Sequence, residues 1–266
     1  MNLGALLDKT VVIVRRDVLT ATRYRTGFLL GAAGALTELA AFYYLSRAVG
    51  PGFRPEGEEY FSFLLVGTGF YTFLLMGVHA FLETVQEAQQ TGTLEVLMTT
   101  STSPPVLVFL SAMSAFAANT VTLAFYLIAG LVFGAPLRPN VVTSLAVFAL
   151  SVVVAAAIGL LAAALQLAVQ KGSAVVWVLG SVWFMTGTLF PVQTLPKPLR
   201  DLADLIPITH SLEGMRLALL EGASLSGVGH ELVILAGFAL VLVPLSLLVF
   251  SWTLRRARLA GTLSFY

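Results

Sequence analysis

The chain has no cysteine and few charged residues, and both absences narrow the functions open to it. Of its 266 residues only 11% are charged, and the net charge is +1. Without cysteine there can be no disulfide framework, thiolate nucleophile or Cys-based zinc or iron–sulfur site. A nearly neutral chain also lacks the basic footprint of a nucleic-acid-binding protein.

Motifs for ATP binding and for hydrolytic chemistry are missing as well. Lys171-Gly172-Ser173 lacks the glycine loop that a phosphate-binding Gly-Lys-Ser requires before it. The three histidines, His79, His210 and His230, are scattered, and there is no His-Glu-x-x-His or Gly-x-Ser-x-Gly. We therefore predict no catalytic residue, no metal site and no cofactor in this chain, so any energy from ATP must come from another subunit.

Apolar residues dominate what is present. They make up 58% of the chain, whereas soluble domains carry about 25% charged residues. The apolar residues gather in runs near the ~20 residues that a helix needs to cross a bilayer. We predict an all-α polytopic membrane protein, a single transmembrane domain over 1–266, with six transmembrane helices at 27–46, 60–82, 105–133, 141–169, 174–190 and 231–254.

Basic residues predict the orientation of these spans. Lys and Arg are concentrated before the first span, at Lys171 between the fourth and fifth, and after the last span. By the positive-inside rule these sides are cytoplasmic. We therefore expect the chain to lie in the cytoplasmic (inner) membrane with both termini on the cytoplasmic side. The first apolar run lacks a convincing cleavage site and is expected to be an uncleaved anchor.

The polar opening, residues 1–26, has leucine and valine at helical spacing with basic residues between them. This pattern predicts an amphipathic helix in the membrane interface, steadied by Arg15, Arg16 and Arg23. An ordinary basic anchor explains the same pattern and stays open.

The second connection, 84–104, is cytoplasmic by topology yet contains no Lys or Arg. It follows Glu83 and carries Glu87 and Glu95. Gly92 interrupts the helix leaving the membrane, Thr93 is a candidate N-cap, and an apolar face follows. Such a projecting helix predicts docking on a soluble partner. Its apolar face consists of Leu94, Leu97 and Met98.

The fifth connection, 191–230, is broken by prolines into helices too short to span a bilayer. We expect a short re-entrant helical hairpin in the outer leaflet, with Pro191, Pro196 and Pro207 at the breaks. Glu213 and Arg216, three residues apart, are expected to pair and fix its second helix.

Two segments resemble one family. Gly92-Thr93-Leu94-Glu95-Val96-Leu97-Met98 is similar to the Gly-Thr-Leu-Glu-x-Leu-Leu signature of the type-two permease family of ATP-binding-cassette exporters. The series Phe190-Pro191, Leu195-Pro196, Pro207-Ile208-Thr209 and Glu213-Gly214-Met215-Arg216 is similar to that family's motifs before the last span. One departure is Gln89-Gln90-Thr91, where family members often carry basic residues.

The resemblance implies an exporter permease built as a dimer, most simply a homodimer, with two copies of a separate ATPase that binds ATP and magnesium. It implies a coupling helix that docks on that ATPase. The residues expected to couple the two subunits are Glu83, Glu87, Gly92, Thr93, Leu94, Glu95, Leu97 and Met98.

Polar residues inside the spans mark a candidate translocation path. Glu38 lies roughly 16 Å beyond Gly27 along the first span, and Asn119 reaches a similar depth on the third, with His79 nearer the inner face. An intramembrane carboxyl costs at least about 2.5 kcal/mol and usually faces protein or water. Two interpretations stay open for Glu38: it lines the path or carries a proton, or it is hydrogen-bonded to Thr37 or a neighbouring helix as structural glue.

Cargo is not determined by these patterns, because one fold serves many functions. A hydrophobic or amphipathic cargo, such as a drug or a lipid, is the preferred prediction. Polysaccharide or lipid-linked glycan export is an alternative, as is a proton-coupled secondary transporter that uses Glu38. A non-transporting scaffold and a heterodimeric permease also remain open.

Overall fold

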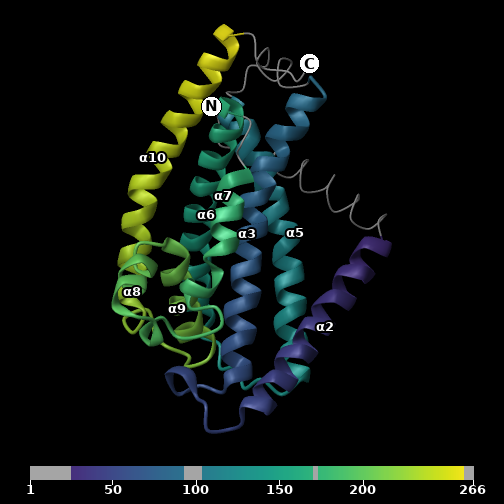
Figure 1. Cartoon of the computed structure of the whole chain (residues 1–266), viewed down its shortest axis with the longest axis vertical. Coiled ribbons are helices and arrows are strands. Elements are labelled where there is room, and N and C mark those ends of the chain that lie inside the picture. Colours follow the sequence, from purple (N-terminus) through teal and green to yellow (C-terminus); the bar gives the residue numbers. More distant parts are fainter. Residues whose placement is uncertain (1–24, 93–103, 170–172, 261–266) are drawn as a thin grey trace.

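The computed structural model describes residues 25–92, 104–169 and 173–260, and within these ranges every regular element is a helix (Figure 1). The α-helices are α2 (Arg25–Val49), α3 (Tyr60–Gln90), α5 (Pro104–Val132), α6 (Val141–Val169), α7 (Ser173–Ser181), α8 (Lys197–Ala203), α9 (Pro207–Leu219) and α10 (Gly229–Ala260). Short 3₁₀ turns lie at Pro55–Gly57 (η1), Trp183–Thr186 (η2) and Val192–Thr194 (η3). The predicted all-α class is confirmed. The predicted interfacial helix at 1–26 lies almost wholly outside the described residues.

The central helix is α3, which packs against α2, α5, α6, α7 and α9. All of its residues from Tyr60 to Tyr71 are buried. A helix that is apolar on every side belongs in the interior of a bundle, because an amphipathic surface helix would need a polar face. On one side of α3, α6 packs between it and α10. Helices α3, α6 and α10 therefore form one packed layer.

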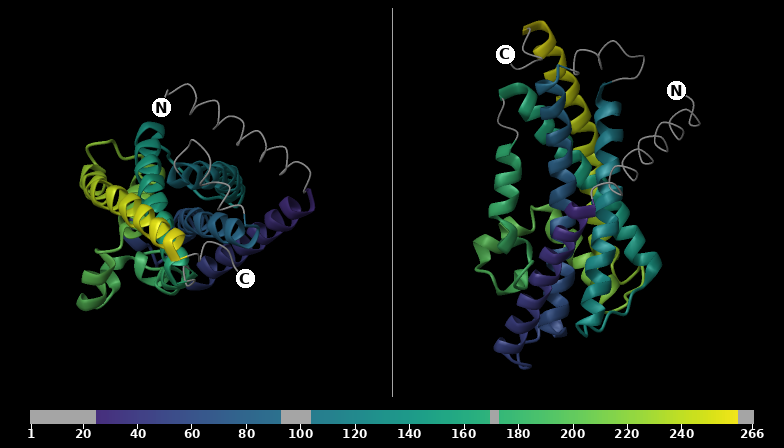
Figure 2. Two further views of the ribbon diagram at one scale, coloured as in Figure 1. Left: turned by 90° about the horizontal axis from the view of Figure 1, so that it is seen from above. Right: turned by 90° about the vertical axis from the view of Figure 1, so that its right-hand side faces the viewer.

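Helix α2 stands at the edge of the bundle. Figures 1 and 2 show it crossing obliquely, close to α3 and α5 at its C-terminal end and apart from them at its N-terminal end. Leu39 of α2 joins Phe61, Leu65 and Tyr126 in a small apolar cluster near the close end. The candidate site lies beside α3, where α2 diverges from the bundle.

Three of the described helices are long and apolar enough to cross a membrane: α3, α6 and α10. The predicted fifth span, 174–190, is not one helix. Helix α7 has nine residues, about 14 Å, which is too short to cross a hydrocarbon core of about 30 Å. The Thr186 and Thr188 hydroxyls both donate to the Trp183 carbonyl, so the chain forms a tight turn there instead of continuing as one helix. Local polar bonding of this kind ended the helix that hydropathy alone predicted.

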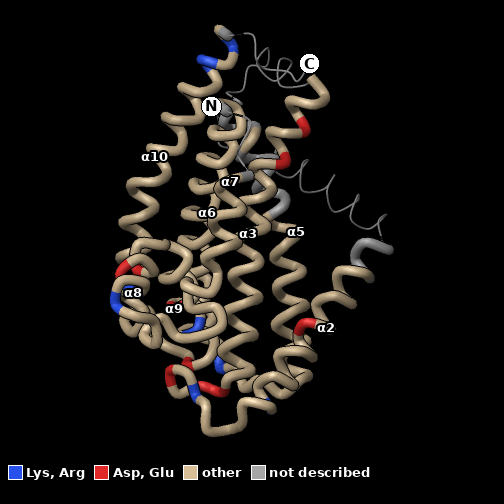
Figure 3. Tube along the Cα trace, in the orientation of Figure 1, with Lys and Arg blue, Asp and Glu red and all other residues tan. Residues whose placement is uncertain are grey.

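Charges lie mainly at the two ends of the bundle (Figure 3). The end formed by the C-terminal halves of α3 and α10 carries Glu83, Glu87 and the basic end of α10. The opposite end holds α8, α9 and the loops after α2 and α5 (Figure 1). Each of α8 and α9 begins at or just after a proline, Pro196 and Pro207 respectively. The predicted breaks at these prolines are therefore present, and a re-entrant position of α8 and α9 in a membrane belongs to the proposal below.

Candidate functional site

A cavity of about 280 Å³ lies between α2, α3 and α5, where α2 diverges from the bundle. The face that α2 turns toward it is made of small residues spaced at helical intervals, followed by Glu38 one turn later. A Cβ atom added at Gly31 or Gly34 would meet nothing within 4 Å, so the missing side chains leave this space open. The lining residues are Gly31, Gly34, Ala35, Glu38, Gly69, Thr72, Phe73, Met76, Asn119, Thr122, Leu123 and Tyr126.

The cavity brings together two of the three residues predicted for a translocation path, Glu38 and Asn119. His79 is not among the lining residues; its Nδ1 lies 3.2 Å from a carboxylate oxygen of Glu83, one turn further along α3. The predicted bond from Thr37 to Glu38 is not formed, because the Thr37 hydroxyl donates to the Ala33 carbonyl at 2.9 Å. Among the described residues no hydrogen bond or ion pair to Glu38 is found, so its carboxyl is free to face the cavity.

A second cavity of about 480 Å³ lies further along α2, at the loop end of the bundle. It is more polar, with Arg47, Arg54 and Glu59 in its lining. The apolar cluster around Leu39 has members in the lining of each cavity. Tyr126 borders the first cavity, and Phe61 borders the second. The two spaces therefore follow each other along α2 with a small apolar plug between them.

Arg216 on α9 is the most deeply buried charge at the other side of α3, with 4% of its surface exposed. Its Nη2 donates to the Gly187 carbonyl at 2.6 Å and, more weakly, to the Thr188 carbonyl at 3.4 Å. The guanidinium carbon lies 3.5 Å from the centre of the Phe63 ring, a cation–π contact. Arg216 thus ties α9 to α3 and to the turn after α7. It does not form the predicted ion pair with Glu213, because backbone carbonyls take its donors instead.

The packing around Arg216 requires a glycine on α3. A Cβ atom added at Gly67 would overlap the Arg216 guanidinium and would lie 2.8 Å from the Thr188 carbonyl oxygen. Both neighbours are fixed, since one is a hydrogen-bonded guanidinium and the other is backbone. The absence of a side chain at Gly67 therefore allows the Arg216 guanidinium to pack directly against α3.

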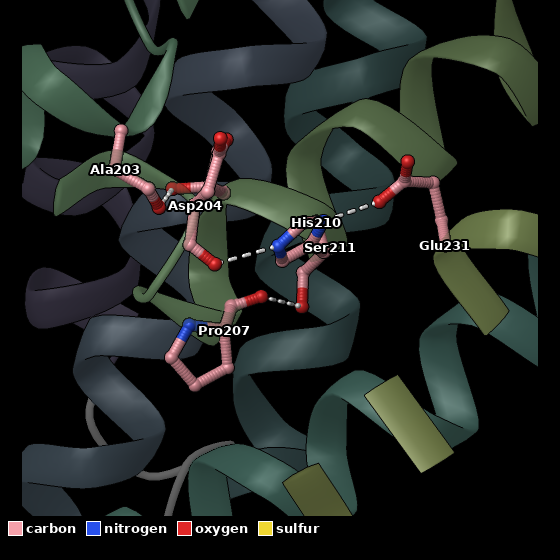
Figure 4. A network of polar contacts seen from close by, with 7 residues as sticks. Ala203, Asp204, Pro207, His210, Ser211 and Glu231 are labelled. Carbon is pink, nitrogen blue, oxygen red and sulfur yellow. Dashed lines mark hydrogen bonds and ion pairs between the residues drawn. The ribbon is translucent and has the colours of Figure 1, made fainter. Parts of the chain in front are cut away.

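A second polar network joins the hairpin to the last helix (Figure 4). His210 Nδ1 lies 2.6 Å from Glu231 Oε2, and His210 Nε2 lies 2.9 Å from the Asp204 carbonyl oxygen. The carbonyl can only accept, so Nε2 carries a proton, and a second proton is held between Nδ1 and the Glu231 carboxyl. Burial alone would lower the pKa of His210, but the bonds to Glu231 and Asp204 outweigh it and raise the pKa.

Glu213 lies one turn before Arg216 on α9, and other carboxyl groups, including that of Glu56, are near it. Burial raises its pKa to about 7, and the Glu56 carboxylate adds to the rise, while the Arg216 charge opposes it. Glu56 is raised in pKa by burial as well. Neither carboxyl is in ion-pair contact with a base among the residues that the structure describes. Glu213 therefore titrates near neutral pH rather than serving as the partner of Arg216.

Only the start of the predicted coupling segment can be described. Helix α3 continues past the predicted span end at 82 to Gln90, and it presents Glu83 and Glu87 to solvent. Gly92 follows with φ +67°, the left-handed conformation that glycine adopts after a helix end. The other coupling residues (Thr93, Leu94, Glu95, Leu97, Met98) and the interfacial arginines (Arg15, Arg16, Arg23) lie outside the described residues.

A scan against protein-family models matches residues 44–248 to the family of ABC-2 family transporter proteins. The match spans α3, α5, α6, α7, the hairpin and most of α10. A comparison with curated proteins finds no match. Because the family model covers well over half of the chain, the chain belongs to the ABC-2 family of transporter proteins and is a transmembrane permease subunit of an ABC transporter, a kind of subunit that associates with an ATP-binding partner.

Proposed function

We propose that this permease moves a hydrophobic or amphipathic cargo outward when its ATP-binding partner hydrolyses ATP. The observation that supports this best is the cavity between α2, α3 and α5, which places Glu38 and Asn119 on a mainly apolar surface within the helices. A concave, mainly apolar space with a few converging polar groups is the usual form of a small-molecule site.

The order of spaces along α2 suggests how cargo passes. Cargo enters the cavity beside Glu38, which we call the inner cavity. The plug formed by Leu39, Phe61 and Tyr126 closes the way to the second cavity, which we call the outer cavity. A tilt of α2 against α3 opens the plug, because α2 stands at the edge of the bundle, packs there against α3 and α5, and diverges from both at its N-terminal end (Figure 1). Export then needs only rigid-body movement of one edge helix.

The assembly that fits this proposal has two permease subunits, most simply two copies of this chain, and two ATPase subunits in a cell's inner membrane. Both termini and the 84–104 connection face the cytoplasm, and the α8–α9 hairpin lies in the outer leaflet. The basic end of α10 supports this orientation by the positive-inside rule, and the C-terminal end of α3, which leads into the 84–104 connection, lies at the same end of the bundle (Figure 3). ATP and magnesium bind in the partner, where ATP is hydrolysed.

A glycan cargo is less well supported. Sugars require many hydrogen-bonding groups and stacking rings along the whole path. The second cavity has such groups in its lining, but among the described residues the first cavity offers only Phe73 and Tyr126 as aromatic residues. Proton-coupled transport through Glu38 remains the competing mechanism, because the carboxyl faces a cavity and lacks a partner among the described residues. The experiments below separate these possibilities.

Affinity purification tests the coupling. The tagged chain in detergent is expected to bring down an ATPase from its native host, and the double variant Leu94→Asp, Glu95→Lys is expected to lose it. The reason is that Leu94→Asp would put a charge into an apolar contact, and Glu95→Lys would reverse the sign of a charge on the docking face. ATPase activity and protein composition of the eluate are measured.

A matched control is Leu259→Asp, at an exposed leucine near the end of α10 on the same side of the bundle. It introduces the same charge and should retain the ATPase. If the wild-type chain is purified alone, or if the double variant keeps the ATPase, the coupling proposal is wrong and proton-driven transport becomes the leading mechanism.

A further inference from the structure

Among the described residues that line the inner cavity, Glu38 is the single acidic residue, and no Lys, Arg or His is present. A carboxylate among helices at this depth is costly without a counter-charge. The described part of the chain supplies none, so the Glu38 carboxyl either holds a proton or is charged beside a bound cation.

The rest of the lining suits the same kind of ligand. The rings of Phe73 and Tyr126 and the thioether of Met76 border the cavity, and such groups attract organic cations while also contacting apolar groups. The Tyr126 hydroxyl is buried without a hydrogen-bond partner in the structure. Buried polar atoms are rarely left unsatisfied, so this hydroxyl is a further group that a ligand can engage.

We propose that this cavity binds an organic cation, an amphiphile whose positively charged amine, quaternary ammonium or comparable group lies against Glu38. Its apolar part contacts Phe73, Met76 and Tyr126. An anion would be repelled by the carboxylate, and a neutral ligand would leave it uncompensated. This inference rests on the proposed export function and names its cargo class.

The size of the cavity agrees with one such ligand. About 280 Å³ is close to the lower end of the roughly 300–1,000 Å³ of small-molecule pockets. Gly31 keeps part of this space empty, since nothing lies within 4 Å of where its Cβ would be. A phenylalanine at position 31 would fill that space without touching Glu38.

Binding of two ions of nearly equal shape and opposite charge tests the proposal. The full chain in lipid nanodiscs is titrated with tetraphenylphosphonium and, separately, with tetraphenylborate, and binding to empty nanodiscs is subtracted. Saturable binding of the cation only is expected. Glu38→Gln should weaken it about 30-fold, as removing one partner of a desolvated charge pair does. Gly31→Phe should weaken it through loss of space.

Two control variants keep the test decisive. Glu221→Gln removes the same charge from an exposed position outside the cavity, and Gly237→Phe adds the same ring on α10 where nothing lies within 4 Å. Both should bind like the wild-type chain. Equal binding of cation and anion, no saturable cation binding, or binding unchanged in Glu38→Gln would each overturn the proposal.

The result is separable from that of the affinity purification. An ATPase that co-purifies with a chain showing no cation binding would leave the exporter function standing and remove this cargo class. Cation binding that depends on Glu38 in a chain that purifies without an ATPase would keep the binding site and remove the ATP-driven mechanism.

Discussion

Replacing Arg216 with methionine is expected to lower the free energy of unfolding by about 2–4 kcal/mol, even though it removes a charge from the interior. Burial lowers the pKa of Arg216 to about 10, so holding its charge is costly. The carbonyls of Gly187 and Thr188 depend on it, however, and each buried acceptor left unsatisfied costs about 1–3 kcal/mol. The second effect is the larger, because methionine offers no donor.

Denaturant titration of the purified chain in mixed micelles measures this change. Arg200→Met is the matched control, since Arg200 also donates to backbone carbonyls, of Gln193 and Leu195, but from an exposed position. It should change stability by less than about 0.5 kcal/mol. Gly67→Ala should destabilise the chain, and less so in the Arg216→Met background, because the added methyl group collides with the guanidinium. Equal effects of Arg216→Met and Arg200→Met would contradict the role assigned to Arg216.

Stability is expected to fall as pH rises from about 4.5 to about 7, by up to about 3 kcal/mol, because of Glu213. Its folded pKa of about 7 lies above the ordinary value of 4.5, so the folded chain binds the proton more tightly than the unfolded chain. The contribution is therefore complete below pH 4.5 and is lost as pH rises through 7. Melting temperature measured at half-unit pH steps follows it.

Glu213→Gln should remove the part of this fall that Glu213 causes, because glutamine fills the same space and does not titrate. His210 acts in the same direction, since its pKa is raised as well and its stabilisation is lost at higher pH. His210→Gln therefore serves as a second variant that flattens the profile. A profile of Glu213→Gln that matches the wild-type profile would show that this carboxyl is not buried as the structure places it.

Long apolar runs were readable from the sequence because lipid imposes a simple length requirement on spanning helices. The predicted span at 141–169 coincides with α6, and 105–133 differs from α5 by one residue at each end. The prediction of one spanning helix at 174–190 was wrong for a specific reason. Thr186 and Thr188 are compatible with a helix by hydropathy, and only their hydroxyl bonds to Trp183 in the folded chain reveal the turn.

The site was only partly predictable. Glu38 and Asn119 were found because polar residues in apolar runs are visible one at a time, and counting residues gives their depth. Tyr126 was missed, since an aromatic residue in a span looks like ordinary core. The partners of Arg216 were also missed, because backbone carbonyls leave no pattern in a sequence. The one available signal was Gly67, because a glycine within a helix can mark a place where another group packs closely against the backbone.

The most direct test of the central claim is transport in inside-out membrane vesicles that contain the chain and its ATPase partner. Uptake of the lipophilic cation rhodamine 6G is followed by fluorescence with the proton gradient collapsed by an uncoupler. The account predicts uptake that requires ATP, persists with the uncoupler and is lost in the Leu94→Asp, Glu95→Lys variant. Uptake that requires a proton gradient and proceeds without ATP would contradict it.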